Sequence, residues 1–213
     1  MNSTDSPCCT QKSPKGCKCG VYIQDINGNL WETKDWDCSA KPNAIAVVTH
    51  EHSFRIALEQ KREIMPISLT DVDEKNRLAK GIRTLEACEG DYDGRHNTNM
   101  ILMHEPRKGR AAGYCQAYVF PDGITHGYLP ALGELRLAYM FKDKVEEALK
   151  TCGGDSMNVG AYYHWSSTFC GTEETATGVT RSCYRVFSFA TGWINYFYVS
   201  AYEYVRPFAP FSA

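Results

Sequence analysis

The first regular pattern of apolar and polar residues begins at Gly20. The segment GVYIQDINGNLW (20–31) alternates apolar and polar positions around an Asn-Gly dipeptide, which strongly favours a turn at Asn27-Gly28 between antiparallel strands. A short apolar run, AIAVVTH (44–50), is typical of a buried strand. We therefore predict that the folded part of the chain begins near residue 20, with a hairpin followed by a third strand.

Helical spacing of apolar residues marks the middle of the chain. It predicts a first helix over 53–64, a second over 70–87 that starts with Thr70, and a short one over 99–105. The segment 113–130 instead alternates around Pro-Asp-Gly, which predicts two strands joined by a turn.

A longer helical pattern follows Pro130, a residue that suits the first turn of a helix. The pattern is interrupted over 141–144 and ends at Gly153-Gly154, where a left-handed cap forms easily. Beyond it we predict only strands and loops. The sum is an α+β fold, with one domain over 20–213 preceded by an extension over 1–19.

Composition changes near residue 150. Residues 1–150 carry 41 charged and 11 aromatic side chains, whereas residues 151–213 carry 7 charged and 15 aromatic ones. Tyrosine dominates this tail, and tyrosine offers a large contact area at low entropic cost on binding surfaces. Buried strands are the alternative explanation for such a composition.

The formal net charge is -2, so the chain lacks the basic footprint of a nucleic-acid binder. No apolar run reaches the roughly 18 residues that span a bilayer, and residues 1–20 contain no apolar stretch typical of a signal peptide. We therefore expect neither a nucleic-acid partner nor membrane insertion, and the sequence leaves the cellular location open.

Four of the ten cysteines lie close together in the N-terminal extension, as CC-x7-C-x-C. Structural zinc sites favour cysteine pairs separated by two to four residues, and this spacing departs from that rule. A flexible or locally cross-linked extension over 1–19 is therefore the preferred interpretation, with a metal clip as the alternative. We expect no resident metal and no cofactor.

Catalytic motifs are absent from the sequence. It has no G-x-S-x-G elbow, phosphate-binding glycine loop, H-E-x-x-H or dinucleotide fingerprint. Cys170 or Cys183 could act as a nucleophile with His164, but no orienting group is evident. The segment DYDGRHNT (91–98) begins like a calcium loop, yet Leu102 stands where the bidentate Glu is required. We expect a protein that is not an enzyme.

Several segments resemble one known family. In order along the chain they are GYLPALGEL (127–135), YYHWSST (162–168), RVFSFATGWI (185–194) and YVRPFAPF (204–211), together with GVYIQDINGNLW and DYDGRHNT. This set resembles the target (variable) proteins of diversity-generating retroelements found in gut Bacteroidales and their phages. The resemblance covers about residues 20–213.

The resemblance implies a C-type-lectin-type fold, related to that of formylglycine-generating enzymes, without a calcium requirement. It also implies a receptor-binding or ligand-binding protein that presents a hypervariable surface on a virion or bacterial cell. The implied partner is a macromolecule, such as a cell-surface protein or glycan. The alternatives are a formylglycine-generating-type oxidase and a structural or assembly protein with an N-terminal metal clip.

In that family, residues vary through miscopied adenines, largely in Asn codons, which cannot then encode Lys, Glu, Gln, Met or Trp. Of the 21 residues over 184–204, only Trp193 and Glu203 lie outside the reachable set. Strand alternation assigns Arg185, Phe187 and Phe189 to the core. We predict that the ligand-binding surface, within about 162–204, consists of His164, Phe169, Cys170, Val186, Ser188, Ala190, Thr191, Trp193, Asn195, Tyr196, Phe197, Tyr198, Ser200, Ala201, Tyr202 and Tyr204.

Overall fold

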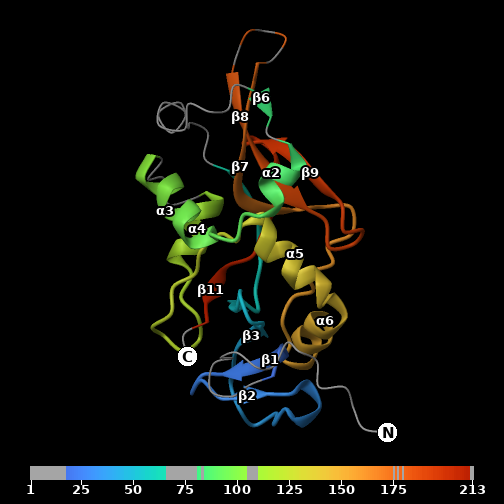
Figure 1. The fold of residues 1–213 in the computed structure, drawn as a ribbon. Helices are drawn as coiled ribbons and strands as arrows, with labels where there is room; N and C mark the ends of the chain where they lie inside the picture. Colours follow the sequence, from blue (N-terminus) through green and yellow to red (C-terminus); the bar gives the residue numbers. More distant parts are fainter. Residues whose placement is uncertain are drawn as a thin grey trace, which may run out of the picture.

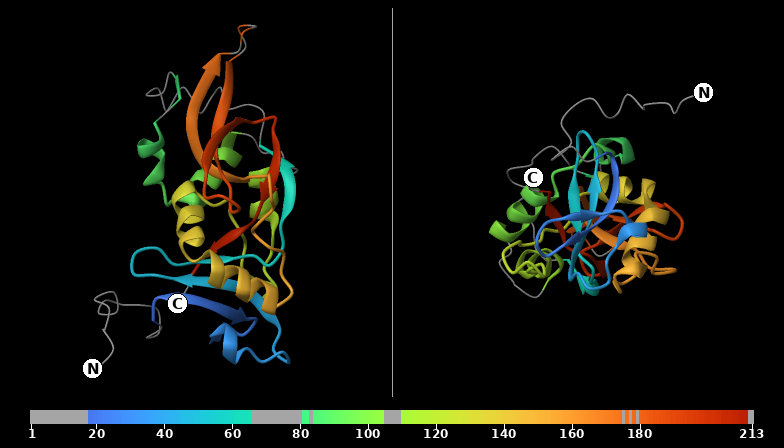
Figure 2. Two further views of the ribbon diagram at one scale, coloured as in Figure 1. Left: turned by 90° about the vertical axis from the view of Figure 1, so that its right-hand side faces the viewer. Right: turned by 90° about the horizontal axis from the view of Figure 1, so that it is seen from below.

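A computed structural model describes residues 18–65, 81–82, 84–104, 110–174, 176, 178 and 180–211. Within them the chain forms two β-sheets and five α-helices, which confirms the α+β class. The sheets lie toward opposite ends of the molecule (Figures 1 and 2). Most of the N-terminal cysteine cluster and most of the helix predicted over 70–87 lie outside the described residues.

The first sheet joins the beginning of the domain to its end. Its strand order is β11-β4-β3-β1-β2, and every neighbouring pair is antiparallel. The strands are β1 (Gly20–Asp25), β2 (Leu30–Trp31), β3 (Pro42–Val48), β4 (Phe54–Ile56) and β11 (Phe208–Pro210). The predicted hairpin and the predicted buried strand are thus confirmed as β1, β2 and β3.

The hairpin turn is fixed by one carboxylate. Asp25 Oδ1 accepts hydrogen bonds from the backbone N–H groups of Asn27 and Asn29, each at 2.9 Å, and Asp25 Oδ2 accepts one from Trp31 Nε1 at 3.1 Å. Gly28 has φ +85°, a left-handed conformation that glycine adopts without a steric penalty. The Asn-Gly pattern therefore specifies the turn as the sequence predicts.

The second sheet is built mostly from the C-terminal third of the chain. Its order is β5-β10-β7-β8-β9, with β6 paired to β7, and β10 runs parallel to β7. The strands are β5 (Lys61–Ile64), β6 (Gly81–Ile82), β7 (His164–Glu174), β8 (Thr180–Phe187), β9 (Ile194–Tyr198) and β10 (Tyr202–Val205). The prediction of strands and loops beyond residue 154 is confirmed.

The helix predicted over 53–64 is wrong, because strands β4 and β5 occupy this segment. Phe54 stacks on Phe208 with ring centroids 4.9 Å apart, and Ile56 pairs with Ile45 in the sheet. These partners are distant in the sequence, so tertiary packing overrides the local helical spacing.

The helices flank the two sheets. They are α2 (Leu85–Glu89), α3 (Gly94–His104), α4 (Ala111–Ala117), α5 (Leu132–Met140) and α6 (Lys142–Thr151). The predicted long helix and its interruption are confirmed as α5 and α6, which meet at Phe141. Helix α3 begins before the predicted residue 99. Helix α4 replaces the first strand predicted over 113–130, and in place of the second strand isolated bridges join Val119 to His126 and Tyr128 to Phe208.

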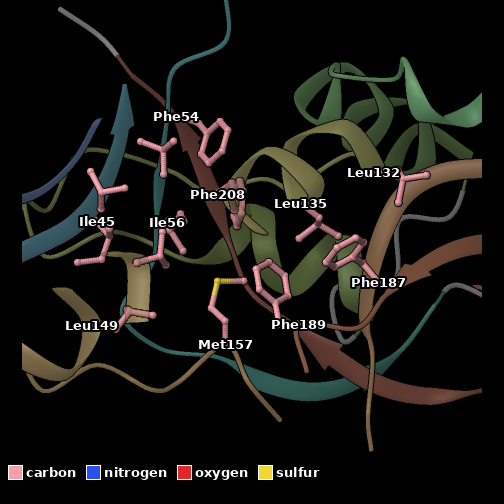
Figure 3. Close-up of a cluster of buried hydrophobic side chains, with 14 of the residues drawn as sticks. Ile45, Phe54, Ile56, Leu132, Leu135, Leu149, Met157, Phe187, Phe189 and Phe208 are labelled. Carbon is pink, nitrogen blue, oxygen red and sulfur yellow. The ribbon is translucent and has the colours of Figure 1, made fainter. Parts of the chain in front are cut away.

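Among the described residues, two large clusters of apolar side chains form most of the core, and a small third one contains Phe120. One gathers residues of β1, β3, β4, β11, α5 and α6 together with Phe187 and Phe189, and Figure 3 shows many of these side chains pointing toward one another. The other contains Trp165, Tyr184 and Val186. Strand β8 therefore contributes to both clusters and is buried on both faces.

A buried carboxylic acid opens helix α5. Glu134 is enclosed at the helix start, where Oε2 accepts a hydrogen bond from the backbone N–H of Ala131 at 2.7 Å and Oε1 lies 2.6 Å from the Tyr128 hydroxyl. Burial raises the pKa of the Glu134 carboxyl to about 8. The folded protein therefore holds a proton that the unfolded chain releases near the ordinary pKa of 4.5.

We expect the free energy of unfolding to fall by about 2 kcal/mol between pH 6.5 and pH 8, because here the unfolded state binds fewer protons than the folded state. His164 has its pKa lowered from 6.5 to about 3, so its own effect on stability has the opposite sign, lies mostly below pH 6.5 and is shared by the Glu134→Gln variant. Urea unfolding of the wild type and Glu134→Gln at both pH values measures the effect. If the free energy of unfolding of Glu134→Gln fell between the two pH values as much as that of the wild type, this assignment would be contradicted.

Candidate binding surface

The structure divides the predicted binding residues by exposure. Trp193 is 70% exposed and Tyr202 is 51% exposed, and both project from ordered backbone. The exposed group contains Ala190, Thr191, Trp193, Asn195, Ser200 and Tyr202, the half-buried group contains Phe169, Tyr196, Phe197, Tyr198, Ala201 and Tyr204, and the buried group contains His164, Cys170, Val186 and Ser188.

For the four buried residues, the prediction of a surface position is wrong. Val186 lies on the central strand β8 and packs within the second core cluster, and Cys170 packs within the first. Ser188 lies in the turn that follows β8, where its N–H donates to the Trp193 carbonyl at 2.9 Å. Alternation along one strand cannot reveal that both of its faces are covered.

His164 belongs to a buried polar network. Gln60 Oε1 accepts hydrogen bonds from Arg206 Nε at 3.2 Å and from His164 Nε2 at 2.8 Å, so His164 carries its proton on Nε2. Burial and the nearby Arg206 charge lower the pKa of His164 to about 3. The imidazole is therefore neutral and holds strands in place below the surface.

A tyrosine–arginine cluster lies at the β5–β10 edge of the second sheet. It consists of Arg62, Tyr162, Tyr202 and Tyr204. The guanidinium carbon of Arg62 lies 4.1 Å from the ring centroid of Tyr162 and 4.6 Å from that of Tyr202. Arg62 Nη2 also donates to the Tyr202 carbonyl at 2.6 Å. Stacking of this kind stabilises a ring orientation by about 0.5–1 kcal/mol at exposed sites.

Sequence reasoning missed Arg62 and Tyr162 as members of this surface. Tyr162 is 42% exposed, and its ring lies 5.8 Å from that of Tyr204. Arg62 reaches the cluster because β5 pairs with β10 in register Arg62 to Tyr204. No local pattern around Arg62 could indicate a contact with residues so far along the chain.

Trp193 projects from the turn between β8 and β9. Its N–H donates to Thr191 Oγ1 at 3.2 Å, and Gly192 has φ +76°. A Cβ on Gly192 would lie 2.8 Å from the Tyr139 ring, so the turn packs tightly on helix α5. The turn therefore holds Trp193 at a defined position on the surface.

The cross-strand register relates Trp193 to the tyrosine–arginine cluster. Tyr204 pairs with His164, His164 pairs with Phe187, and Phe187 pairs with Ile194. Three strand spacings of about 4.8 Å separate the first and last of these residues by about 15 Å. On this sheet the buried His164 and Phe187 lie between the cluster at one edge and Trp193 toward the other, and we name these two exposed aromatic groups together the aromatic surface.

The half-buried tyrosines of β9 serve partly as scaffold. The Tyr198 hydroxyl donates to Glu173 Oε2 at 2.8 Å, and the Arg185 guanidinium lies 5.9 Å from the Tyr196 ring centroid. Both rings also pack against the first core cluster. Their rings therefore contribute to the packing of the fold.

The thiols considered as nucleophiles are buried. Burial raises the pKa of Cys170 to about 12 and that of Cys183 to about 11, so both are protonated at neutral pH. Among the described residues, no group of three or more His, Cys, Asp or Glu side chains is arranged to hold a metal ion. No helix in this part of the chain is long and apolar enough to cross a membrane.

Comparisons of this chain with protein families, with curated proteins and with solved structures find no match.

Proposed function

We propose that this protein binds a macromolecular partner through its aromatic surface and does not act as an enzyme. The observation that carries the proposal is the exposure of Trp193, Tyr202 and Tyr162 on ordered backbone. Large aromatic side chains are costly to leave in water, and gathered exposed ones mark interaction sites. The neutral imidazole of His164 and the protonated buried thiols favour binding over nucleophilic chemistry.

The chemistry of the aromatic surface suits a cell-surface protein or glycan. Tyrosine and tryptophan rings pack against apolar faces of sugars or side chains, while tyrosine hydroxyls donate and accept hydrogen bonds. The Arg62 guanidinium adds a positive charge that is already oriented by its stacking on Tyr162 and Tyr202. Oriented rings and a fixed charge reduce the entropy lost when a partner binds.

The resemblance to retroelement target proteins extends the proposal to a diversified surface on a C-type-lectin-type fold. Its support is that exposed residues lie within the expected variable region, while Glu203, which miscopied Asn codons cannot reach, serves the scaffold. Trp193, which such codons also cannot reach, is an invariant member of the exposed surface in this proposal. Glu203 Oε2 accepts a hydrogen bond from the Tyr163 N–H at 2.9 Å. Sequencing the DNA beside the gene tests this part. A reverse transcriptase gene and a near-copy of the 3′ coding end support it, and their absence leaves an invariant binding domain.

Trp193→Ala and Tyr202→Ala are each expected to weaken binding of an identified partner by about 2 kcal/mol, or roughly 30-fold, because exposed aromatic anchors dominate such interfaces. A screen of bacterial surface proteins and glycans supplies the partner, and surface plasmon resonance measures its affinity.

Met103→Ala is the matched control, because Met103 is 75% exposed and lies outside the aromatic surface. It is expected to bind as the wild type does. Urea unfolding of all three variants checks that the fold is retained. Wild-type affinity in both aromatic variants, for every partner found, would refute the proposal.

A further inference from the structure

A pocket lies away from the aromatic surface, among residues of α3, α4 and β11, which Figure 1 shows on one side of the molecule. It encloses about 430 Å³, within the range of about 300–1,000 Å³ that small-molecule pockets occupy. Its walls come from strand β4, helices α3 and α4, the segment 124–128 and the end of β11. None of its lining residues belongs to the aromatic surface.

Within the described part of the chain, the lining of this pocket includes two guanidinium groups and His126 but no acidic side chain. Arg55 is held firmly, because its Nε donates to the Pro210 carbonyl at 3.0 Å and its Nη1 lies 3.4 Å from Asp122 Oδ2. Among the described residues, Arg55 Nη2 has no hydrogen-bond partner. Its two N–H groups remain available for a ligand.

Arg95 provides the second positive charge from the first turn of α3. It forms no ion pair or hydrogen bond with the described part of the chain. Arg55 is compensated by Asp122, whereas Arg95 has no such partner there. Two positive charges that line one pocket repel each other. A bound anion would be attracted by both guanidinium groups and would offset this repulsion.

The remaining lining supplies donors and an apolar wall. Gln116 Nε2 lies 3.5 Å from Asn99 Oδ1, which leaves the Asn99 amide N–H groups for another acceptor. Ile124 and Pro210 provide apolar surface beside these groups. The lining thus combines guanidinium and amide N–H donors with apolar surface.

We propose that this pocket binds a small organic anion, whose carboxylate or phosphate group pairs with Arg55 and Arg95. Guanidinium groups match either anion with paired N–H donors, and such charge-assisted hydrogen bonds are the strong ones. The apolar part of the ligand lies against Ile124 and Pro210. This site is independent of the proposed binding of a macromolecule by the aromatic surface.

Isothermal titration calorimetry of the full chain tests the proposal with phenyl phosphate, benzoate and the neutral analogue benzamide. We expect one or both anions to bind, with benzamide at least about tenfold weaker. Tighter binding of phenyl phosphate assigns the site to phosphate ligands, and tighter binding of benzoate assigns it to carboxylates. Absence of binding by both anions at about 10 mM, or equal binding of benzamide, overturns the proposal.

Arg95→Gln is the informative variant, because Arg95 is exposed and its replacement leaves the Arg55–Asp122 pair intact. It is expected to weaken anion binding by about tenfold or more. Arg136→Gln is the matched control, since Arg136 is a surface arginine paired with Glu89 outside the pocket. Equal anion affinity of Arg95→Gln and wild type also overturns the proposal.

Discussion

Replacement of Arg206 by Ala is expected to lower the free energy of unfolding by about 4 kcal/mol. Arg206 is only 1% exposed. Its Nη1 donates to the Ala57 carbonyl at 2.8 Å, and its Nη2 donates to the Asp155 carbonyl at 2.7 Å. Removing the guanidinium leaves buried acceptors without a donor and opens a cavity, and both effects oppose folding.

The expected loss is large because Arg206 connects several segments of the chain. It connects the end of β4 to the loop after α6, and through Gln60 it reaches His164 at the start of β7. Burial lowers the pKa of Arg206 to about 10, which still leaves it charged at neutral pH. The buried cation is satisfied by carbonyl oxygens, which no smaller side chain can bridge.

Urea unfolding measures the change, with Arg136→Ala as the control. Arg136 is partly exposed and pairs with Glu89 at 3.2 Å, a surface interaction worth less than about 1 kcal/mol. Arg206→Lys keeps the charge but presents fewer donors, and we expect an intermediate loss of about 2 kcal/mol. A loss below about 1 kcal/mol in Arg206→Ala would contradict this role.

Local patterns predicted the parts of the fold that local interactions specify. The hairpin of β1 and β2 follows from Asn27-Gly28 and from the Asp25 carboxylate two residues before Asn27, all within one turn. The division of α5 from α6 and the left-handed residue Gly153 are likewise local. These features depend on backbone preferences that a sequence displays directly.

Features that depend on distant partners escaped prediction. The segment 53–64 has helical spacing, but Phe54 meets Phe208 and Arg55 meets Asp122, which are remote in the sequence. In the candidate site, Arg62 joins the tyrosines only through the pairing of β5 with β10. Contacts of this kind carry no periodicity, so the sequence could indicate the tyrosine-rich region but not its cationic member.

Under the diversification proposed above, the burial of β8 limits which tail residues can vary. Val186 is fully buried, whereas Asn195, which faces it across the β8–β9 pair, is exposed. Miscopied Asn codons reach both residue types, so codon arithmetic alone does not separate them. Packing does separate them, because a close-packed core tolerates few changes while a solvent-facing position tolerates many.

Val186→Asn is therefore expected to lower the free energy of unfolding by about 3 kcal/mol, through lost apolar burial and an amide without partners in the core. The reciprocal change Asn195→Val is expected to stay within about 0.5 kcal/mol of the wild type, because its side chain meets solvent. Urea unfolding of both variants gives the comparison. Equal stability of Val186→Asn and Asn195→Val would contradict this expectation. It would mean that the buried face of β8 tolerates different side chains and that Val186 could belong to a variable surface.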